Sequence, residues 1–339
     1  MRKITPFSLL TAVLLLTSCA ANNEPHQKSF FAMDTYITAE AYGNNAEAAL
    51  NSAQERIISL ERLWSVTDEN SEIYSVNHSG GEAVELSGET AELLNFALNI
   101  SADTDGALDC TLYPVLTQWG FTTGEYRVPD DETLSELLEN TGYEKVHLNG
   151  NRVTVPQDMQ LDLGAVGKGY AGDLAAEVLK ENGVNSALLN LGGNIQAIGS
   201  KPDGTPWKIG LRNPFGEGSF AALEISDRAV ITSGGYERFF ADENGVEYHH
   251  ILNPKTGKPA DSGIISATII GSEGRLCDAL STAVFVMGLD SAEQLWRQRN
   301  DFEMVLISDN GKIYITEGLA EVFTLNEYYG NLEVEVIYR

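Results

Sequence analysis

"LCDALSTAVFVMG", residues 276–288, reads as a buried helix that carries a carboxylate near its start. Asp278 and Thr282 lie four residues apart and therefore share one helical face. A charged group at the foot of so apolar a helix needs a partner. Either Asp278 caps the helix by accepting free backbone N–H groups, or it holds a cation, and this stretch by itself leaves both interpretations open.

Amphipathic patterns earlier in the chain predict further helices. The first covers residues 44–64, and further helices are expected at 89–101, 131–140 and 166–182, the last ending at Gly183 as a C-cap. Residues 44–64 place a set of apolar side chains on one face, namely Ala46, Ala49, Leu50, Ala53, Ile57, Leu60 and Trp64.

Strand-like runs dominate the second half of the chain. Residues 145–155 alternate like a hairpin that turns at Asn149-Gly150, and residues 308–312 read as another hairpin turn. The other strand-like runs are residues 186–191, 207–211, 221–226, 229–234, 265–270, 304–308, 312–316 and 333–338. Strands and helices do not alternate strictly, and no linker rich in Pro, Ser or Gly divides the chain. We therefore expect an α+β fold with largely antiparallel and mixed sheets and packed helices, as a single domain of two intertwined halves.

The charge balance restricts the ligands that the protein can bind. The chain has 339 residues and a formal net charge of −27. Such a surface repels a phosphate backbone, so nucleic acid is excluded as a partner. A phosphate ligand would need a cation or a local run of backbone N–H donors.

The N-terminus has the layout of an export signal. Arg2 and Lys3 precede a short apolar run over residues 7–16, and the segment ends in "LTSCA" at Cys19. This resembles a bacterial lipoprotein signal, although an ordinary signal peptide with a chance cysteine remains an alternative. We expect removal of residues 1–18, lipidation of Cys19, a tether over 19–29 and a functional domain over 30–339, anchored at the outer face of the cytoplasmic membrane. The remaining cysteines, Cys110 and Cys277, could pair or stay as buried free thiols.

A glycine-rich segment gives a misleading signal. "GKGYAG", residues 167–172, satisfies the G-x-G-x-x-G pattern of nicotinamide-dependent oxidoreductases. The next strand-like run lacks the acidic residue that a dinucleotide site needs, and Gly169 stands where a phosphate-binding loop has Ser or Thr. The glycines would let the backbone approach a ligand, and Lys168 would supply a positive charge; tight packing with a solvated lysine is the alternative.

Several longer motifs occur together in a fixed order. They are "MDT" (33–35), "TDGALDCTLYPVLTQWGF" (104–121), "LDLGAVGKGYAGD" (161–173), "LLNLGGNI" (188–195), "ITSGGYERFF" (231–240), "EYHHILNPKTGKPA" (247–260) and "CDALSTAVFVMG" (277–288). Together they resemble the ApbE family of flavin transferases, the FAD:protein FMN transferases, over about residues 31–323. The resemblance implies a T-fold-related architecture and an enzyme that cleaves FAD and transfers FMN to a Thr or Ser hydroxyl of an acceptor protein, releasing AMP.

The resemblance also implies a magnesium ion and its ligands. Asp278 and Thr282 match metal-binding side chains, and Ala165 matches a residue that contributes its backbone carbonyl. This donor set is physically coherent, because Mg²⁺ takes hard oxygen ligands and keeps waters and substrate phosphates in its shell. The cation would also offset the acidic surface when the phosphates of FAD bind.

Other positions match flavin-binding or catalytic segments of the family. The residues that match FAD-contacting positions are Met33, Thr67, Ala107, Leu108, Asp109, Asp162, Lys168 and Ile251, although Thr67 stands where an aromatic residue is common. Considered in isolation, Met33 and Ile251 could be core residues and Asp109 a cap.

Proton handling and phosphate contact have candidates at the histidine pair. His250 is the preferred general base, with His249 and Asp278 as alternatives. Arg238 could pair with a phosphate or form a surface ion pair, and Asn253 departs from an aspartate that is common in relatives. Without a catalytic acceptor step, the same features would suit an FAD pyrophosphatase or a non-catalytic FAD-binding lipoprotein. A membrane electron-transfer subunit would be a plausible acceptor for an exported enzyme.

Overall fold

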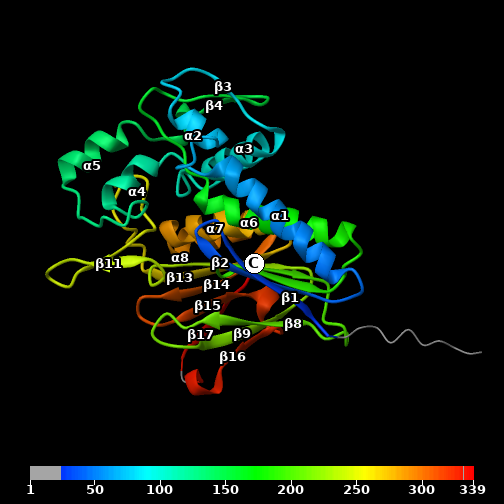
Figure 1. Cartoon of the computed structure of the whole chain (residues 1–339). Coiled ribbons are helices and arrows are strands. Elements are labelled where there is room, and N and C mark those ends of the chain that lie inside the picture. The colour runs from blue at the N-terminus through cyan, green and yellow to red at the C-terminus, as the bar shows by residue number, and fades with distance from the viewer. Residues whose placement is uncertain (1–23, 331) are drawn as a thin grey trace, which may run out of the picture.

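A large, mostly antiparallel sheet runs through the molecule, with helices on one face and a smaller sheet against the other (Figure 1). The structure is a computed structural model and describes residues 24–330 and 332–339. The predicted signal, Cys19 and most of the tether lie outside these residues. Within them, no helix combines the length and apolar character that crossing a bilayer requires.

Strands from both halves of the chain build the large sheet. In spatial order, its described strands are β1 (His26–Ala32), β2 (Thr35–Ala41), β6 (Ala187–Leu191), β7 (Asn194–Ile198), β10 (Ala229–Gly234), β13 (Ile264–Gly271), β14 (Phe302–Ser308), β15 (Ile313–Thr316) and β17 (Val334–Ile337). Strand β2 pairs with β6, about 150 residues later in the chain, and β15 pairs in parallel with β17. The predicted α+β fold with mixed sheets is confirmed.

The described chain also contains three smaller sheets. One contains β8 (Trp207–Arg212), β9 (Ser219–Ile225) and β16 (Phe323–Leu325); a second contains β3 (Val84–Glu85), β4 (His147–Asn149) and β5 (Arg152–Thr154); and a hairpin contains β11 (Phe239–Ala241) and β12 (Glu247–His249). The predicted hairpin forms from β4 and β5, but its two-residue turn is Gly150-Asn151, one residue later than predicted, because Asn149 still pairs with Arg152. Gly150 adopts a positive φ of 59° at the first position of this turn.

The helices of the described chain have these bounds: α1 (Ala46–Trp64), α2 (Glu72–Asn77), α3 (Gly88–Asp103), α4 (Tyr113–Trp119), α5 (Asp131–Leu138), α6 (Gly164–Glu181), α7 (Gly274–Met287) and α8 (Leu289–Gln298). Figure 1 shows α1, α6 and α7 above one face of the large sheet, with α2 and α3 beyond them. The main hydrophobic core lies between these helices and the sheet, and a second core lies between the sheet and β8–β9–β16. All seven apolar residues predicted for the inner face of α1 are buried.

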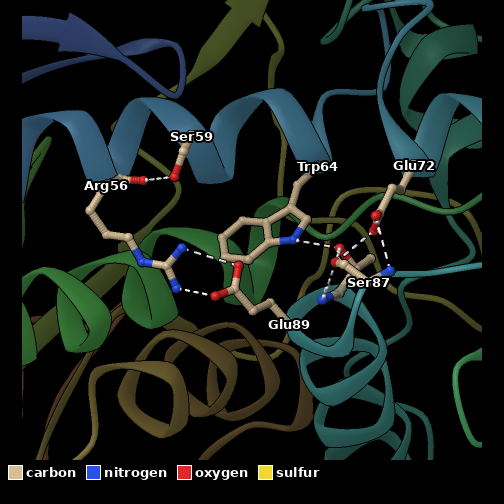
Figure 2. Close-up of polar contacts among 7 residues, drawn as sticks. Arg56, Ser59, Trp64, Glu72, Ser87 and Glu89 are labelled. Atoms are coloured by element: carbon tan, nitrogen blue, oxygen red, sulfur yellow. Dashed lines mark hydrogen bonds and ion pairs between the residues drawn. The ribbon is translucent and has the colours of Figure 1, made fainter.

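Polar contacts fix α1 against the start of α3 (Figure 2). Trp64 donates its ring N–H to Thr90 Oγ1 at 3.2 Å, and Arg56 forms an ion pair with Glu89. Ser87 caps α3 and is held by the carboxylate of Glu72 at 2.9 and 3.0 Å. These bonds fix the position of the C-terminal end of α1.

Helices α6 and α7 cross at two glycines. A Cβ atom on Gly169 would lie 2.2 Å from the carbonyl oxygen of Gly274, and one on Gly274 would lie 2.6 Å from that of Gly169. No side chain fits at such separations, so the two backbones are in direct contact. The helix predicted from "LCDALSTAVFVMG" is α7, and it begins two residues before that stretch, at Gly274.

Substitution of Gly169 tests this crossing. Gly169→Ala is expected to lower the free energy of unfolding by about 3 kcal/mol, because backbone has to move to admit the methyl group. Gly172 on the same helix is the control: the nearest atom to its added Cβ is 3.9 Å away. Gly172→Ala should leave stability unchanged or raise it by up to about 1 kcal/mol. Urea unfolding that gives equal stabilities for the two variants would contradict the close crossing.

Candidate functional site

Asp278 extends from α7 toward α6 and is almost fully buried, with 5% of its surface exposed. Its Oδ2 accepts the backbone N–H of Gly169 at 2.8 Å, and its Oδ1 accepts Asn194 Nδ2 at 2.9 Å. Helix α7 begins at Gly274, four residues earlier, so Asp278 does not cap it. The capping alternative is wrong, and the carboxylate instead ties α7 to α6 and to the start of β7.

A second carboxylate makes the reverse connection. Asp173 on α6 accepts the N–H groups of Gly274 at 2.6 Å and of Arg275 at 2.9 Å, which are free donors at the first turn of α7. The sequence analysis did not find Asp173 or Asn194, because their roles depend on a tertiary contact. Asn194, in the "LLNLGGNI" motif, donates to Asp278.

Burial sets the acidity of both carboxylates. It raises the pKa of Asp278 above its ordinary value, although the nearby Lys168 ammonium and the bonds from Gly169 and Asn194 act in the opposite direction. Burial likewise raises the pKa of Asp173 to about 6. An ionised Asp278 is therefore costly in this position, which favours a cation beside it.

The predicted magnesium ligands fit such a cation. Thr282 lies one turn after Asp278 on α7 and is half-buried, and Ala165 is half-buried in the first turn of α6. Each Asp278 oxygen has one hydrogen-bond donor and so retains a lone pair for a metal. Among the described residues, no group of three or more His, Cys, Asp or Glu side chains could hold a metal. The donor set thus supplies one charge and neutral oxygens, which suits Mg²⁺ that retains substrate oxygens and waters.

Ser233 on β10 contacts the α7 residues that surround Asp278. Ser233 Oγ lies 2.8 Å from Ser281 Oγ and 3.3 Å from Thr282 Oγ1, and Ser281 donates to the backbone carbonyl of Asp278. These hydroxyls fix the rotamers next to the proposed ligands. Ser233 belongs to "ITSGGYERFF", but its position in the sequence gave no sign of this role.

The positive charge of Lys168 acts on two buried carboxylates, Asp162 and Asp278. Desolvation raises the pKa of Asp162, and the charges of Lys168 and Arg238 oppose this rise. The charge of Lys168 also opposes the rise in the pKa of Asp278, and its ammonium group donates to the carbonyl of Gly164 at 3.4 Å. Asp162 accepts the N–H of Gly164 at 2.7 Å at the start of α6, and its backbone N–H donates to the backbone carbonyl of Cys110. The predicted Asp162 and Lys168 therefore lie at the N-terminal end of α6, close in the chain to Gly169, which bonds Asp278.

His250 borders the same region from the end of the β11–β12 hairpin. Its Nδ1 lies 3.1 Å from the carbonyl of Arg238, which can only accept, so Nδ1 carries the proton and Nε2 keeps a lone pair. Burial, Arg238 and Lys168 lower the pKa of His250 to about 4. His250 is neutral at neutral pH. The expectation of a pKa near neutrality does not fit the protein without substrate.

His249 and Arg238 contact other parts of the fold through ring packing and hydrogen bonds to backbone carbonyls. His249 packs edge-on against Phe285 of α7, and its Nε2 donates to the carbonyl of Ala260. Arg238 donates to the carbonyl of Phe121 at 2.7 Å, so neither of the two alternatives considered for it describes this contact. Asn253 accepts the N–H of Lys255 within a turn.

Met33 lies in a strained turn beside this site. Met33 and Asp34 form the two-residue connection of the β1–β2 hairpin, and both have positive φ, 52° and 56°. For residues with a side chain this conformation costs about 1 kcal/mol or more each. Glu61 on α1 accepts the Met33 N–H at 2.6 Å, and Thr35 packs against Gly192, two residues before Asn194. The turn therefore lies next to the loop that holds Asp278.

The other predicted flavin contacts have mixed positions. Ala107, Leu108 and Ile251 are buried in the main core, and Thr67 is exposed in the loop after α1. Ala107 also lines a cavity of about 210 Å³ with Asn253 and Met287. The carboxylate of Asp109 is occupied by Thr111 and by the N–H of Tyr143, so its side chain shapes the loop.

The "GKGYAG" segment has a packing function. It lies within α6 rather than in a strand-to-helix turn, and Gly167 packs against the ring of Trp64 while Gly169 meets α7. The segment therefore does not form the strand-to-helix turn that a dinucleotide-binding site requires. Cys110 and Cys277, close to Asp109 and Asp278 in sequence, are both buried free thiols.

Comparison with known proteins assigns the family. The sequence model described as the ApbE family matches residues 33–306. The chain belongs to the ApbE family. It is 31% identical to an FAD:protein FMN transferase of Treponema pallidum, over 87% of this chain and 88% of that protein. A Klebsiella pneumoniae protein of the same name is 30% identical, over 87% and 93%.

Solved ApbE structures share this fold. The ApbE protein of Thermotoga maritima superposes with a TM-score of 0.83 at 33% identity, covering 88% of this chain and 99% of that one. The flavin transferase ApbE of Vibrio cholerae gives a TM-score of 0.79 at 26% identity, covering 88% and 100%. The predicted family is confirmed.

The acidity of Asp173 gives a pH test of the helix crossing. The pKa of Asp173 is higher in the folded chain than its ordinary value of 3.8, so ionisation destabilises the fold and protonation below about pH 6 removes that penalty. Between pH 7 and pH 5 the wild type should gain about 1–2 kcal/mol in unfolding free energy relative to Asp173→Asn, after allowance for solvent screening. Denaturant titrations in which both proteins change in parallel would refute the assignment.

Proposed function

We propose that this protein is an FAD:protein FMN transferase that uses Mg²⁺ and modifies a Thr or Ser hydroxyl of an acceptor protein. The supporting observation is the buried Asp278 carboxylate, held by Gly169 and Asn194 beside Thr282, Ala165 and Lys168. A buried anion with spare lone pairs next to a lysine suits a metal–phosphate complex. The family membership supports the identity of the substrate.

The proposed reaction exchanges one phosphoester for another. The acceptor hydroxyl oxygen bonds to the phosphorus on the FMN side of the pyrophosphate, and the bond from that phosphorus to the bridging oxygen breaks. AMP leaves with the bridging oxygen, and the hydroxyl proton passes to a base. Such transfers depend on positioning and on neutralising the phosphate charge.

The residues of this chain divide these tasks. Asp278, Thr282 and the carbonyl of Ala165 would hold Mg²⁺, which supplies Lewis-acid neutralisation of the pyrophosphate. Lys168 adds a positive charge near the start of α6, where its ammonium group donates to the carbonyl of Gly164 at 3.4 Å. Met33 and the segment 107–109 would contact the flavin and adenosine parts of FAD. Thr67 and Ile251 would also contact FAD.

His250 is the proposed proton acceptor. Its Nε2 lone pair is available because Nδ1–H is committed to the Arg238 carbonyl. A pKa near 4 makes it a weak base in the free enzyme. Bound phosphates place negative charge nearby and raise this pKa, which brings the base toward the optimum for proton transfer.

We propose that the enzyme works outside the cytoplasmic membrane. The support is the export-type segment with Arg2, Lys3 and Cys19, which lies outside the described residues. A lipid on Cys19 would keep the domain near membrane-bound acceptors such as an electron-transfer subunit.

A transfer assay tests the function. The domain, incubated with FAD, Mg²⁺ and an acceptor protein from the same cell envelope, should yield an acceptor band whose flavin fluorescence survives denaturation, with AMP as the second product. AMP together with free FMN in equal amounts, with or without acceptor, would instead identify an FAD pyrophosphatase. Stoichiometric FAD binding without AMP would identify a non-catalytic flavin carrier.

Asp278→Asn separates charge from shape at the metal position. The amide keeps the size of the side chain and one oxygen acceptor but loses the negative charge that a cation needs. We expect a loss of at least about 100-fold in metal-dependent turnover with the fold retained. Turnover within about threefold of wild type would remove Asp278 from the metal site.

The unusual acidity of His250 predicts a particular pH profile. Because the unprotonated base is the active form, kcat/KM for FAD should stay level from pH 8 down to about pH 5.5 and fall only below it. His250→Ala should lower kcat by about 100-fold, with a smaller effect on FAD affinity. An acidic limb centred at pH 6.5 or above, unchanged in His250→Ala, would assign the base to another group.

A further inference from the structure

Glu61 makes a contact that the proposed mechanism has not used. It lies on the last turns of α1, is half-buried, and directs one carboxylate oxygen at the backbone N–H of Met33, 2.6 Å away. The two residues are separated by 28 positions in the chain. The bond is a charge-assisted one between a helix and a hairpin tip.

The hairpin tip needs an external hold. Two-residue connections with positive φ at both central positions usually contain Asn or Gly. Here the positions are Met33 and Asp34, and a long side chain such as that of Met33 rarely adopts this conformation. The surrounding structure must therefore stabilise the turn, and the Glu61 carboxylate is the group that bonds its backbone.

The turn is rigidly connected on both sides. Glu61 itself is fixed because α1 is anchored one turn later by Trp64, which bonds Thr90 and stacks on Tyr170 of α6 at 5.8 Å (Figure 2 shows the Trp64 end of this anchor). On the other side, Thr35 fills the space above Gly192, where a Cβ would come within 1.9 Å of its hydroxyl oxygen. Asn194 follows and donates to Asp278.

We propose that Glu61 is a positioning residue for FAD: its carboxylate holds the Met33–Asp34 turn in the left-handed conformation and thereby presents Met33 to the flavin. This inference rests on the proposed function, because it requires FAD to bind beside Met33. Glu61 acts through the turn and touches neither the flavin nor the phosphates.

Removal of the carboxylate should weaken FAD binding without disabling the chemistry. Glu61→Ala is expected to raise the Kd for FAD and the KM for FAD by about tenfold, with kcat within about threefold of wild type. Amide exchange at Met33 should accelerate in the same variant. Glu61→Gln retains an oxygen acceptor and should bind FAD within about threefold of wild type. Glu55→Ala, at an exposed position of the same helix, is the matched control and should behave as wild type.

A second substitution tests the route of the effect. Asp34→Gly removes one of the two side chains that disfavour positive φ, so the turn depends less on Glu61, although Met33 keeps its strain. The increase in the Kd for FAD caused by Glu61→Ala should therefore be smaller in the Asp34→Gly background, about threefold, than the tenfold increase expected in the wild-type background. This comparison also serves if Glu61→Ala alone proves unstable.

The outcomes separate this inference from the proposed function. Wild-type protein that does not bind FAD overturns the proposed function. Wild-type binding with equal affinity in Glu61→Ala and Glu55→Ala overturns the role of Glu61 only. A tenfold loss that persists in the Asp34→Gly background shows that Glu61 does not act through the turn and also overturns the inference.

Discussion

The contact between α6 and α7 is the constraint on which the rest of the site depends. Gly169 and Gly274 bring the two backbones together, and Asp278 and Asp173 each accept N–H groups from the opposite helix. Asp278, one of these two carboxylates, is also the proposed metal ligand. Loss of the crossing would therefore move Asp278, Thr282 and Lys168 together, because all three project from these two helices.

Two hairpins, β6–β7 and β1–β2, connect Asp278 to the edge of the large sheet. The β6–β7 turn supplies Asn194 to Asp278, and the neighbouring β1–β2 turn packs on it through Thr35. Strain at Met33 and Asp34 is tolerated because Glu61 and the adjacent hairpin define the turn. The flavin side and the metal side of the proposed site thus share one set of contacts, with Lys168 and His250 at its border.

Local patterns in the sequence predicted much of the fold. The inner face of α1 was predicted residue by residue, and the β4–β5 hairpin was predicted with its turn one residue too early. The β1–β2 hairpin was missed because Met-Asp carries no turn signal. Asp173, Ser233 and Glu61 were missed because their roles arise from contacts between segments far apart in the chain. His250 was found, but burial and the charge of Arg238 alter its acidity in a way no local pattern reveals.

The position of the cation tests the account most directly. Crystals of the domain grown with FAD and Mn²⁺, a substitute for Mg²⁺ with a measurable anomalous signal, would locate it. The account predicts one anomalous peak within coordination distance of an Asp278 carboxylate oxygen, Thr282 Oγ1 and the Ala165 carbonyl, with a pyrophosphate oxygen of FAD in the same shell. A peak elsewhere, or FAD bound with its pyrophosphate away from Asp278, would contradict it.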